Sequence, residues 1–188
     1  MIQIMSATLM DHIRSLSTGR RTFGAGQHVF NQGDEVGSLY LVESGIVHLV
    51  RYQPDGNVAV LQRASSGLIL AEASVFSSAY HCDAVAVTEL EATSVPIPLI
   101  KRALRSNPDF AEDWASYLSH QLQQARKRAE IANLKTVAAR LESWLAWNNG
   151  VLPSKGEWKA LAEDIGVSPE ALYRELSKRR RSFVRDRA

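Results

Sequence analysis

The residue types that do chemistry gather in one stretch, where Glu72 is followed by His81, Cys82 and Asp83. A thiol or an imidazole can ligate haem iron, and a thiolate can be oxidised. Cys82 is the only cysteine, which excludes an intramolecular disulfide, a Cys₄ zinc site and a cysteine-held iron–sulfur cluster within one chain. A single cysteine is most often a small buried apolar residue. We therefore predict no metal and no cofactor, with haem or a metal at His81 or Cys82 as the less favoured alternative.

The sequence also lacks the spacings of common catalytic motifs. It contains no Gly-x-Ser-x-Gly, no His-Glu-x-x-His and no phosphate-binding P-loop. The spacing of Glu72, Cys82 and Asp83 pairs no nucleophile with a base. We predict that the chain is not an enzyme.

A second chemically distinct stretch is basic. Residues 178–188 carry a net charge of +5 in a chain whose total is +2, which leaves −3 for the rest. A basic tip on a mildly acidic body is expected of a protein that meets a polyanion, and a solvated helix end is the alternative interpretation. The basic residues are Lys178, Arg179, Arg180, Arg181, Arg185 and Arg187.

Neither a membrane nor an export signal is indicated. No run approaches the ~20 apolar residues of a membrane helix. The first 16 residues lack the charged-then-apolar order of a signal peptide. With a single cysteine, the sequence favours a cytoplasmic protein without a membrane partner.

The residue pattern of the first half of the chain predicts β-structure. Short β-type runs alternate with glycine turns, which is typical of an antiparallel sandwich or barrel. Pro54-Asp55-Gly56 predicts a hairpin between two of the best runs. The predicted strands are residues 20–23, 28–30, 39–43, 46–53, 58–64, 68–71, 82–87 and 92–97.

A long helix follows. Asn107-Pro108-Asp109 is a helix start, because proline at the first helical position loses no hydrogen bond. Further along, apolar residues recur at spacings of 4, 3, 4 and 3, which favours a coiled-coil seam and a parallel homodimer. Packing of the helix on its own β half is the alternative. The predicted seam, with the tryptophan that precedes it, is Trp114, Leu118, Leu122, Ala125, Ala129 and Ala132.

The last third predicts helices joined by a tight turn. Helical patterns cover residues 137–145 and 157–164, and Gly166 permits a sharp turn after the second. Ser168 is then a good N-cap and Pro169 suits the first position of another helix. This is the helix-turn-helix pattern.

The order of these parts resembles the catabolite-activator (CRP/FNR) family of bacterial transcription regulators over about residues 20–180. The similarity rests on residues 32–34 (Gln-Gly-Asp), 44–47 (Ser-Gly-Ile-Val) and 165–170 (Ile-Gly-Val-Ser-Pro-Glu). The resemblance implies an α+β fold. It comprises an antiparallel β jelly roll with a cyclic-nucleotide-binding-like sensor domain (1–105), a dimerisation helix (106–134) and a helix-turn-helix DNA-binding domain (135–188). The implied partners are double-stranded DNA, a second copy of the chain and RNA polymerase.

The implied ligand pocket departs from the family. Where members that bind cyclic AMP have Gly-Glu-Leu, residues 71–73 are Ala-Glu-Ala, which keeps the acid at Glu72. The Arg-Ser pair that holds the cyclic phosphate is replaced by Cys82-Asp83. Losing a charge-assisted bond to phosphate costs about 1.5–3 kcal/mol, and Asp83 would repel the anion.

The adenine-reading hydroxyls on the long helix are also replaced, by Ala125-Arg126. We therefore expect an effector other than cyclic AMP, or none. The candidate effector-pocket residues are Glu72, His81, Cys82, Asp83, Ala125 and Arg126.

The resemblance also places the DNA contacts. The base-facing candidates are Ser168, Glu170, Ala171 and Arg174, and the phosphate-facing candidates are Lys178, Arg179, Arg180 and Arg181. Family members continue into a β-hairpin wing, of which only residues 182–184 resemble the start, so we expect a missing or truncated wing. The sequence thus predicts a homodimeric DNA-binding regulator. The alternative is a sensor or interaction protein of the same fold with degenerate DNA binding.

Overall fold

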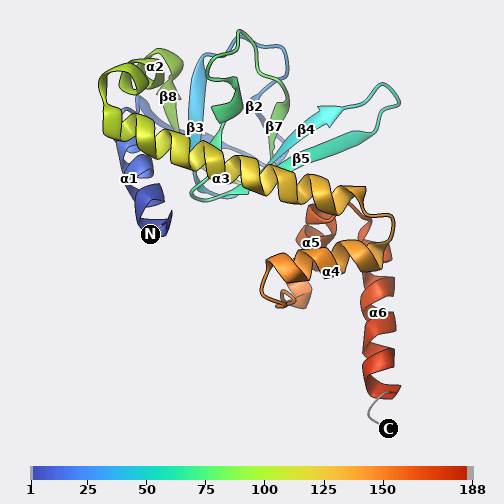
Figure 1. Cartoon of the computed structure of the whole chain (residues 1–188). Coiled ribbons are helices and arrows are strands. Elements are labelled where there is room, and N and C mark those ends of the chain that lie inside the picture. Colours follow the sequence, from blue (N-terminus) through green and yellow to red (C-terminus); the bar gives the residue numbers. More distant parts are fainter. Residues whose placement is uncertain (1, 186–188) are drawn as a thin grey trace. The chain divides into compact units, whose positions relative to one another are not determined.

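The structure is a computed structural model that describes residues 2–185 and the surroundings of the side chains of residues 8–180. The chain divides into two compact units, residues 1–120 and 121–188 (Figure 1). The division falls inside the long helix α3 (Pro108–Asn133). The predicted functional boundaries, by contrast, follow the two ends of that helix.

The first unit is a jelly roll of two four-stranded antiparallel sheets with strand orders β1-β8-β3-β6 and β2-β7-β4-β5. All eight predicted strands are present, and the predicted fold class is confirmed. The unit contains α1 (Ile2–Ser15), β1 (Gly19–Phe23), β2 (His28–Phe30), β3 (Ser38–Ser44), β4 (Ile46–Tyr52), β5 (Val58–Ser65), β6 (Ile69–Leu70), η1 (Glu72–Ser74), β7 (Asp83–Ala86), β8 (Leu90–Pro96) and α2 (Ile97–Ser106).

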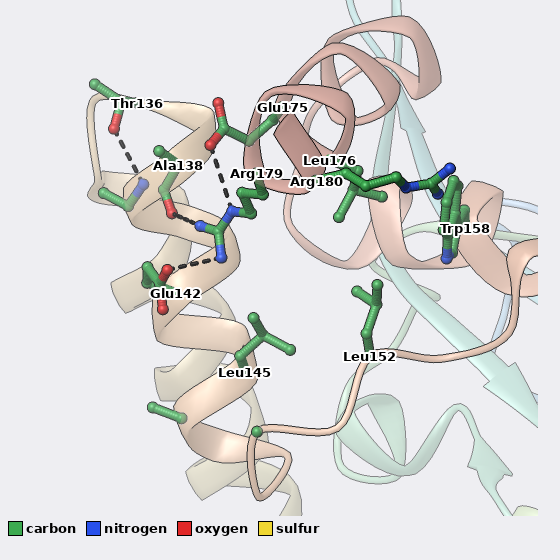
Figure 2. A pocket seen from close by; sticks show the side chains of 13 residues that line it. Thr136, Ala138, Glu142, Leu145, Leu152, Trp158, Glu175, Leu176, Arg179 and Arg180 are labelled. Carbon is green, nitrogen blue, oxygen red and sulfur yellow. Dashed lines mark hydrogen bonds and ion pairs between the residues drawn. The ribbon is translucent and has the colours of Figure 1, made fainter. Parts of the chain in front are cut away.

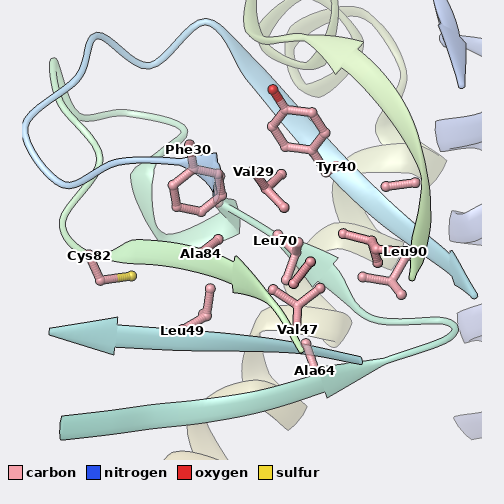
Figure 3. Close-up of a cluster of buried hydrophobic side chains, with 14 of the residues drawn as sticks. Val29, Phe30, Tyr40, Val47, Leu49, Ala64, Leu70, Cys82, Ala84 and Leu90 are labelled. Atoms are coloured by element: carbon pink, nitrogen blue, oxygen red, sulfur yellow. The ribbon is translucent and has the colours of Figure 1, made fainter. Parts of the chain in front are cut away.

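Strand β3 shows why the sandwich forms. Tyr40 and Val42 face a core between the two sheets, to which β4 and β7 also contribute (Figure 3). Leu39 and Leu41 belong to a second core on the other side of the strand. Because successive side chains point to opposite faces, burial on both sides requires the continuous apolar run seen in the sequence.

The second core is built by helices of the same unit. Ile13 of α1, Ile100 of α2 and Phe110 of α3 are buried in it. Trp114 lies there too and is 3% exposed. The tryptophan that precedes the predicted seam therefore packs within the first unit.

The second unit is helical. It contains the end of α3, α4 (Val137–Trp147), η2 (Lys155–Glu157), α5 (Trp158–Asp164) and α6 (Pro169–Arg185). Thr136 caps α4, since its hydroxyl accepts a hydrogen bond from Ala139 N–H at 3.1 Å. Leu141, Leu161 and Leu172, one each from α4, α5 and α6, meet in its core.

The expected start of a wing is not extended structure. The backbone of residues 182–184 continues α6 as helix. No glycine or proline interrupts the chain between Pro169 and this point, so nothing ends the helix there.

Among the described helices, none combines the length and the apolar character needed to cross a bilayer.

Candidate functional site

A short turn joins α5 to α6 at the predicted position. Gly166 adopts φ +65°, a left-handed conformation that side chains with a Cβ rarely tolerate. Ser168 then caps α6, because its hydroxyl accepts a hydrogen bond from Ala171 N–H at 3.2 Å. Ile165 is buried in the core of the second unit and anchors the turn.

Arg140 of α4 fixes this turn to the end of α3. Its guanidinium donates to the carbonyls of Ala132 (2.8 Å) and Leu134 (2.9 Å), at and just beyond the end of α3. It also donates to the carbonyls of Ile165 (3.2 Å) and Gly166 (2.7 Å) in the turn. One side chain therefore satisfies the free carbonyls where two helices end.

The first two turns of α6 present polar side chains to solvent. Glu170 and Arg174 are exposed, whereas Ala171 is half-buried. The pKa of Glu170 lies below its ordinary value, because its carboxylate accepts hydrogen bonds from its own N–H and from Ser168, and lies near the Arg174 cation. The ionised Glu170 carboxylate, which accepts hydrogen bonds, and the Arg174 guanidinium, which can donate two, therefore lie one helical turn apart.

The four basic residues further along α6 differ in their surroundings. Lys178 and Arg180 are exposed, and the side chain of Arg181 lies outside the described residues. Arg179 instead bonds to Glu142 of α4 at 2.7 Å and to Glu175 at 3.4 Å (Figure 2).

Arg179 also donates to the carbonyl of Ala138 at 3.3 Å. Its guanidinium therefore braces α6 against α4, and its phosphate contact stays a prediction. Its position in a run of four cations gave no sign of this.

The remaining seam residues of α3 form an open apolar stripe. Leu122 is 51% exposed, and Ala125, Ala129 and Ala132 are exposed as well. Leu118 is partly buried against the second core of the first unit. A stripe of this kind leaves apolar surface in water unless a partner covers it.

In the first unit, the predicted pocket residues Glu72, His81 and Cys82 lie near one another. Cys82 is fully buried in the core between the sheets (Figure 3). Burial, and then the Glu72 carboxylate, raise the pKa of its thiol to about 11. His81 Nδ1 lies 3.0 Å from the hydroxyl of Ser74, and burial lowers the pKa of His81.

Ala71, which precedes this cluster, adopts the left-handed φ of 70°. That conformation costs a residue with a Cβ about 1–2 kcal/mol.

The hydrogen bond and the close contact of the Asp83 carboxylate are made with residues outside this cluster. Successive strand residues face opposite ways, and Cys82 faces the core. The Asp83 carboxylate instead accepts a hydrogen bond from Gln32 N–H at 3.3 Å and lies 3.5 Å from His28 Nδ1. In this structure the Asp83 carboxylate therefore faces Gln32 and His28, and its predicted place in an effector pocket stays a prediction.

Ala125 and Arg126, the other candidates for this pocket, are exposed residues of the second unit. Across residues 2–185, no three histidine, cysteine or acidic side chains lie close enough together to hold a metal ion.

Comparisons with known proteins identify the first unit. Residues 20–107 match the family model described as the cyclic nucleotide-binding domain. The chain carries a cyclic nucleotide-binding domain, and its homologues are CRP/FNR-type regulators.

The relatives extend beyond that domain. The global nitrogen regulator of Synechococcus elongatus is 28% identical over 93% of this chain and 87% of its own length. The c-di-GMP-responsive global regulator CLP of Xanthomonas campestris superposes with a TM-score of 0.67, at 23% identity, over 94% of this chain and 92% of that one. FixK2 of Bradyrhizobium japonicum does so with a TM-score of 0.69, at 16% identity, over 85% and 83%.

The similarity to the CLP and FixK2 structures supports the fold alone, because the sequence identity is low. The related sequences are named as regulators and not as enzymes. The prediction that the chain is not an enzyme is thereby confirmed. Cys82 lies within the matched residues and is fully buried.

Sequence reasoning missed Arg140, the residue that fixes the turn between α5 and α6 to the end of α3. Its partners lie up to 26 residues away in sequence. The signal available in the sequence was that Arg140 lies among mostly apolar residues of α4. This pattern alone is weak evidence for a buried arginine with several partners.

Proposed function

We propose that this chain is a homodimeric transcription regulator that reads operator DNA with α6 and responds to an effector other than cyclic AMP, or to none. The observation that carries the proposal is the capped turn at Gly166 and Ser168, which precedes exposed Glu170 and Arg174 and is braced by Arg140. Such a helix presents its N-terminal residues to the major groove.

The chemistry of these side chains suits base edges. Arg174 can donate two hydrogen bonds to O6 and N7 of guanine, and the ionised Glu170 can accept one from the amino group of cytosine. Lys178 and Arg180 follow on the same helix and suit phosphates, which position the protein without reading sequence. The +5 charge of residues 178–188 supports the same partner.

The exposed stripe of α3 supports the dimer. Leu122 and the three exposed alanines after it form a narrow apolar seam of coiled-coil spacing, and small side chains allow two helices to approach closely. A dimer presents two copies of α6 to two half-sites. In this proposal it acts in the cytoplasm and contacts RNA polymerase at promoters.

The expected lack of cyclic AMP binding follows from the residue at position 82. Cys82 cannot replace an arginine at a phosphate, because its thiol is buried and stays neutral at physiological pH. Calorimetry should detect no cyclic AMP binding. Micromolar affinity would contradict this part of the proposal.

The DNA proposal is tested by selecting duplexes from a random pool with the purified chain. We expect a palindromic site with half-sites about one helical turn apart. Arg174→Ala should weaken binding to the selected site about 10- to 100-fold and relax one base position. Lys178→Ala should weaken binding to all duplexes alike and lower the salt slope by about 1.

The matched control is Arg105→Ala, which removes an exposed cation from α2 instead of α6. It should leave the affinity and the preferred sequence unchanged. If the wild-type chain shows no salt-sensitive duplex binding at about 50 mM salt, the DNA proposal is wrong.

One observation favours the alternative of a sensor or interaction protein. An apolar groove of about 1170 Å³ runs between α4 and α6 and is lined by Leu145, Leu152, Trp158 and Leu176 among others (Figure 2). Exposed apolar surface of this kind marks interaction sites. A stable dimer that binds no duplex would support this alternative.

A further inference from the structure

The groove between α4 and α6 is an apolar cavity within the second unit (Figure 2). Its volume of about 1170 Å³ is ample for a small molecule. Helices α4, α5 and α6 and the loop after α4 contribute its apolar lining, and Leu152 of that loop is 38% exposed. An apolar molecule in the groove would therefore remove apolar surface from water.

The indole of Trp158 gives the groove a fixed apolar wall. Its Nε1 N–H donates to the carbonyl of Pro153 at 3.1 Å, so the one polar atom of the ring is satisfied. Tyr173 of α6 packs near the ring, with the two ring centroids 5.7 Å apart. The ring is therefore held by two neighbouring segments, and a ligand in the groove meets it as an apolar surface.

Most polar side chains of the groove are occupied by one another. The hydroxyl of Thr136 caps α4. Arg179 pairs with Glu142 at 2.7 Å and with Glu175 at 3.4 Å. Both carboxylates point to Arg179, on the side of the groove away from Trp158 (Figure 2). This side of the groove therefore has no unpaired cation for an anionic ligand.

Arg180 carries the open charge of the groove. Its side chain is exposed and makes no hydrogen bond or ion pair with any side chain or carbonyl of residues 8–180. Figure 2 shows it extending in the direction of Trp158, away from Arg179. A guanidinium matches the two oxygens of a carboxylate with two parallel hydrogen bonds. The groove thus combines an apolar wall with one unpaired cation.

We propose that this groove binds a small molecule with one negative charge and an extended apolar body, such as a medium-chain carboxylic acid. The apolar body lies against the leucines of the groove and Trp158, and the carboxylate accepts hydrogen bonds from Arg180. One cation without a partner matches one negative charge, whereas Glu142 and Glu175 would repel a second. The inference concerns the second unit alone and goes beyond the proposed function.

The test is a titration of the full chain with octanoate and decanoate at neutral pH, without DNA and below the concentrations at which the acids aggregate. Tryptophan fluorescence reports contact with Trp158, and calorimetry measures the affinity independently. We expect both acids to bind. Decanoate should bind more tightly by up to about 15-fold, because two more methylenes are buried. Decanol, which has the same apolar body without the charge, is the ligand control.

Three variants make the test specific. Arg180→Gln should weaken decanoate binding at least about tenfold, since a charge-assisted hydrogen bond is lost, and should leave decanol binding unchanged. Trp158→Phe should remove most of the fluorescence change but retain the calorimetric signal, which would place the ligand in the groove. Lys159→Gln, which removes an exposed cation of α5 outside the groove lining, should bind like the wild type. The melting temperature without ligand shows that each variant is folded.

Three results would overturn the inference. The first is a folded wild-type chain that binds neither acid, and the second is an affinity for decanoate that Arg180→Gln leaves unchanged. The third is a dimer that decanoate dissociates and Leu152→Asn weakens, because a second copy of the chain would then cover the groove.

Arg180 is also a candidate for a phosphate contact, so duplex binding is measured separately on the same preparations without acid. A failure of acid binding with intact duplex binding removes only the acid site. A wild-type chain that binds the acids but no duplex removes only the DNA proposal.

Discussion

Replacing Arg140 by methionine should destabilise the second unit and leave the first unchanged. Methionine keeps much of the side-chain volume but removes four charge-assisted hydrogen bonds to main-chain carbonyls. Two of these bonds, to Leu134 and Ile165, are partly buried, so their carbonyls are poorly rehydrated when the donor is lost.

The size of the effect follows from those two bonds. Hydrogen bonds to charged groups are worth about 1.5–3 kcal/mol each when a partner is removed. Counting only the two partly buried bonds at the lower figure gives a loss of about 3 kcal/mol in the free energy of unfolding. That corresponds to an increase of about a hundredfold in the open population of the second unit.

Hydrogen exchange measured by mass spectrometry resolves the two units. Core amides of the second unit, such as those of Leu141 and Leu161, should exchange about a hundredfold faster, whereas those of the jelly roll should not change. Arg140→Lys should not rescue the loss, because one ammonium group cannot reach four carbonyls in this arrangement. Arg126→Met is the matched control on α3. Equal exchange in Arg140→Met and this control would refute the reasoning.

Three further predictions concern the first unit. Ala71→Gly should raise the free energy of unfolding in urea by about 0.5–1 kcal/mol, because glycine relieves the left-handed strain, and Ala73→Gly, as the control, should give no gain. Cys82, fully buried with a pKa raised to about 11, should resist a thiol reagent at about pH 8 until denaturant is added, and prompt reaction of the folded chain would contradict its burial. The bond from Arg14 lowers the pKa of Glu43 below its ordinary value of 4.5, so its stabilisation is present above that value and is lost as the pH falls through the folded pKa. Glu43→Gln should flatten the stability profile between about pH 5 and pH 3, and an unchanged slope would rule out this pair as the cause.

Local signals in the sequence predicted the strands and turns because their causes lie within a few residues. The hairpin at Pro54-Asp55-Gly56 forms as expected, with Gly56 at φ +84° and its N–H donating to the Gln53 carbonyl at 3.0 Å. The Ser168 cap of α6 is of the same kind. Glycine conformation and capping chemistry require no knowledge of the rest of the fold.

Long-range contacts account for the features that the sequence pattern could not predict. Trp114 and Leu122 continue one apolar spacing, yet the first is buried within the chain and the second is exposed. Periodicity shows which face is apolar and not which surface covers it. Arg179 likewise looks like its basic neighbours until Glu142 of α4 is brought beside it.

The pairing of β1 with β8 bears on how newly made chains fold. Gly19 lies opposite Ser94 and Phe23 opposite Leu90, so the first sheet cannot close until about 96 residues have left the ribosome. Pairing between strands that lie far apart in the sequence makes the jelly roll fold slowly. The helices of the second unit pack on helices close to them in the sequence and therefore fold quickly. A stalled chain shorter than this would leave the β3 edge open to strand exchange with another nascent chain.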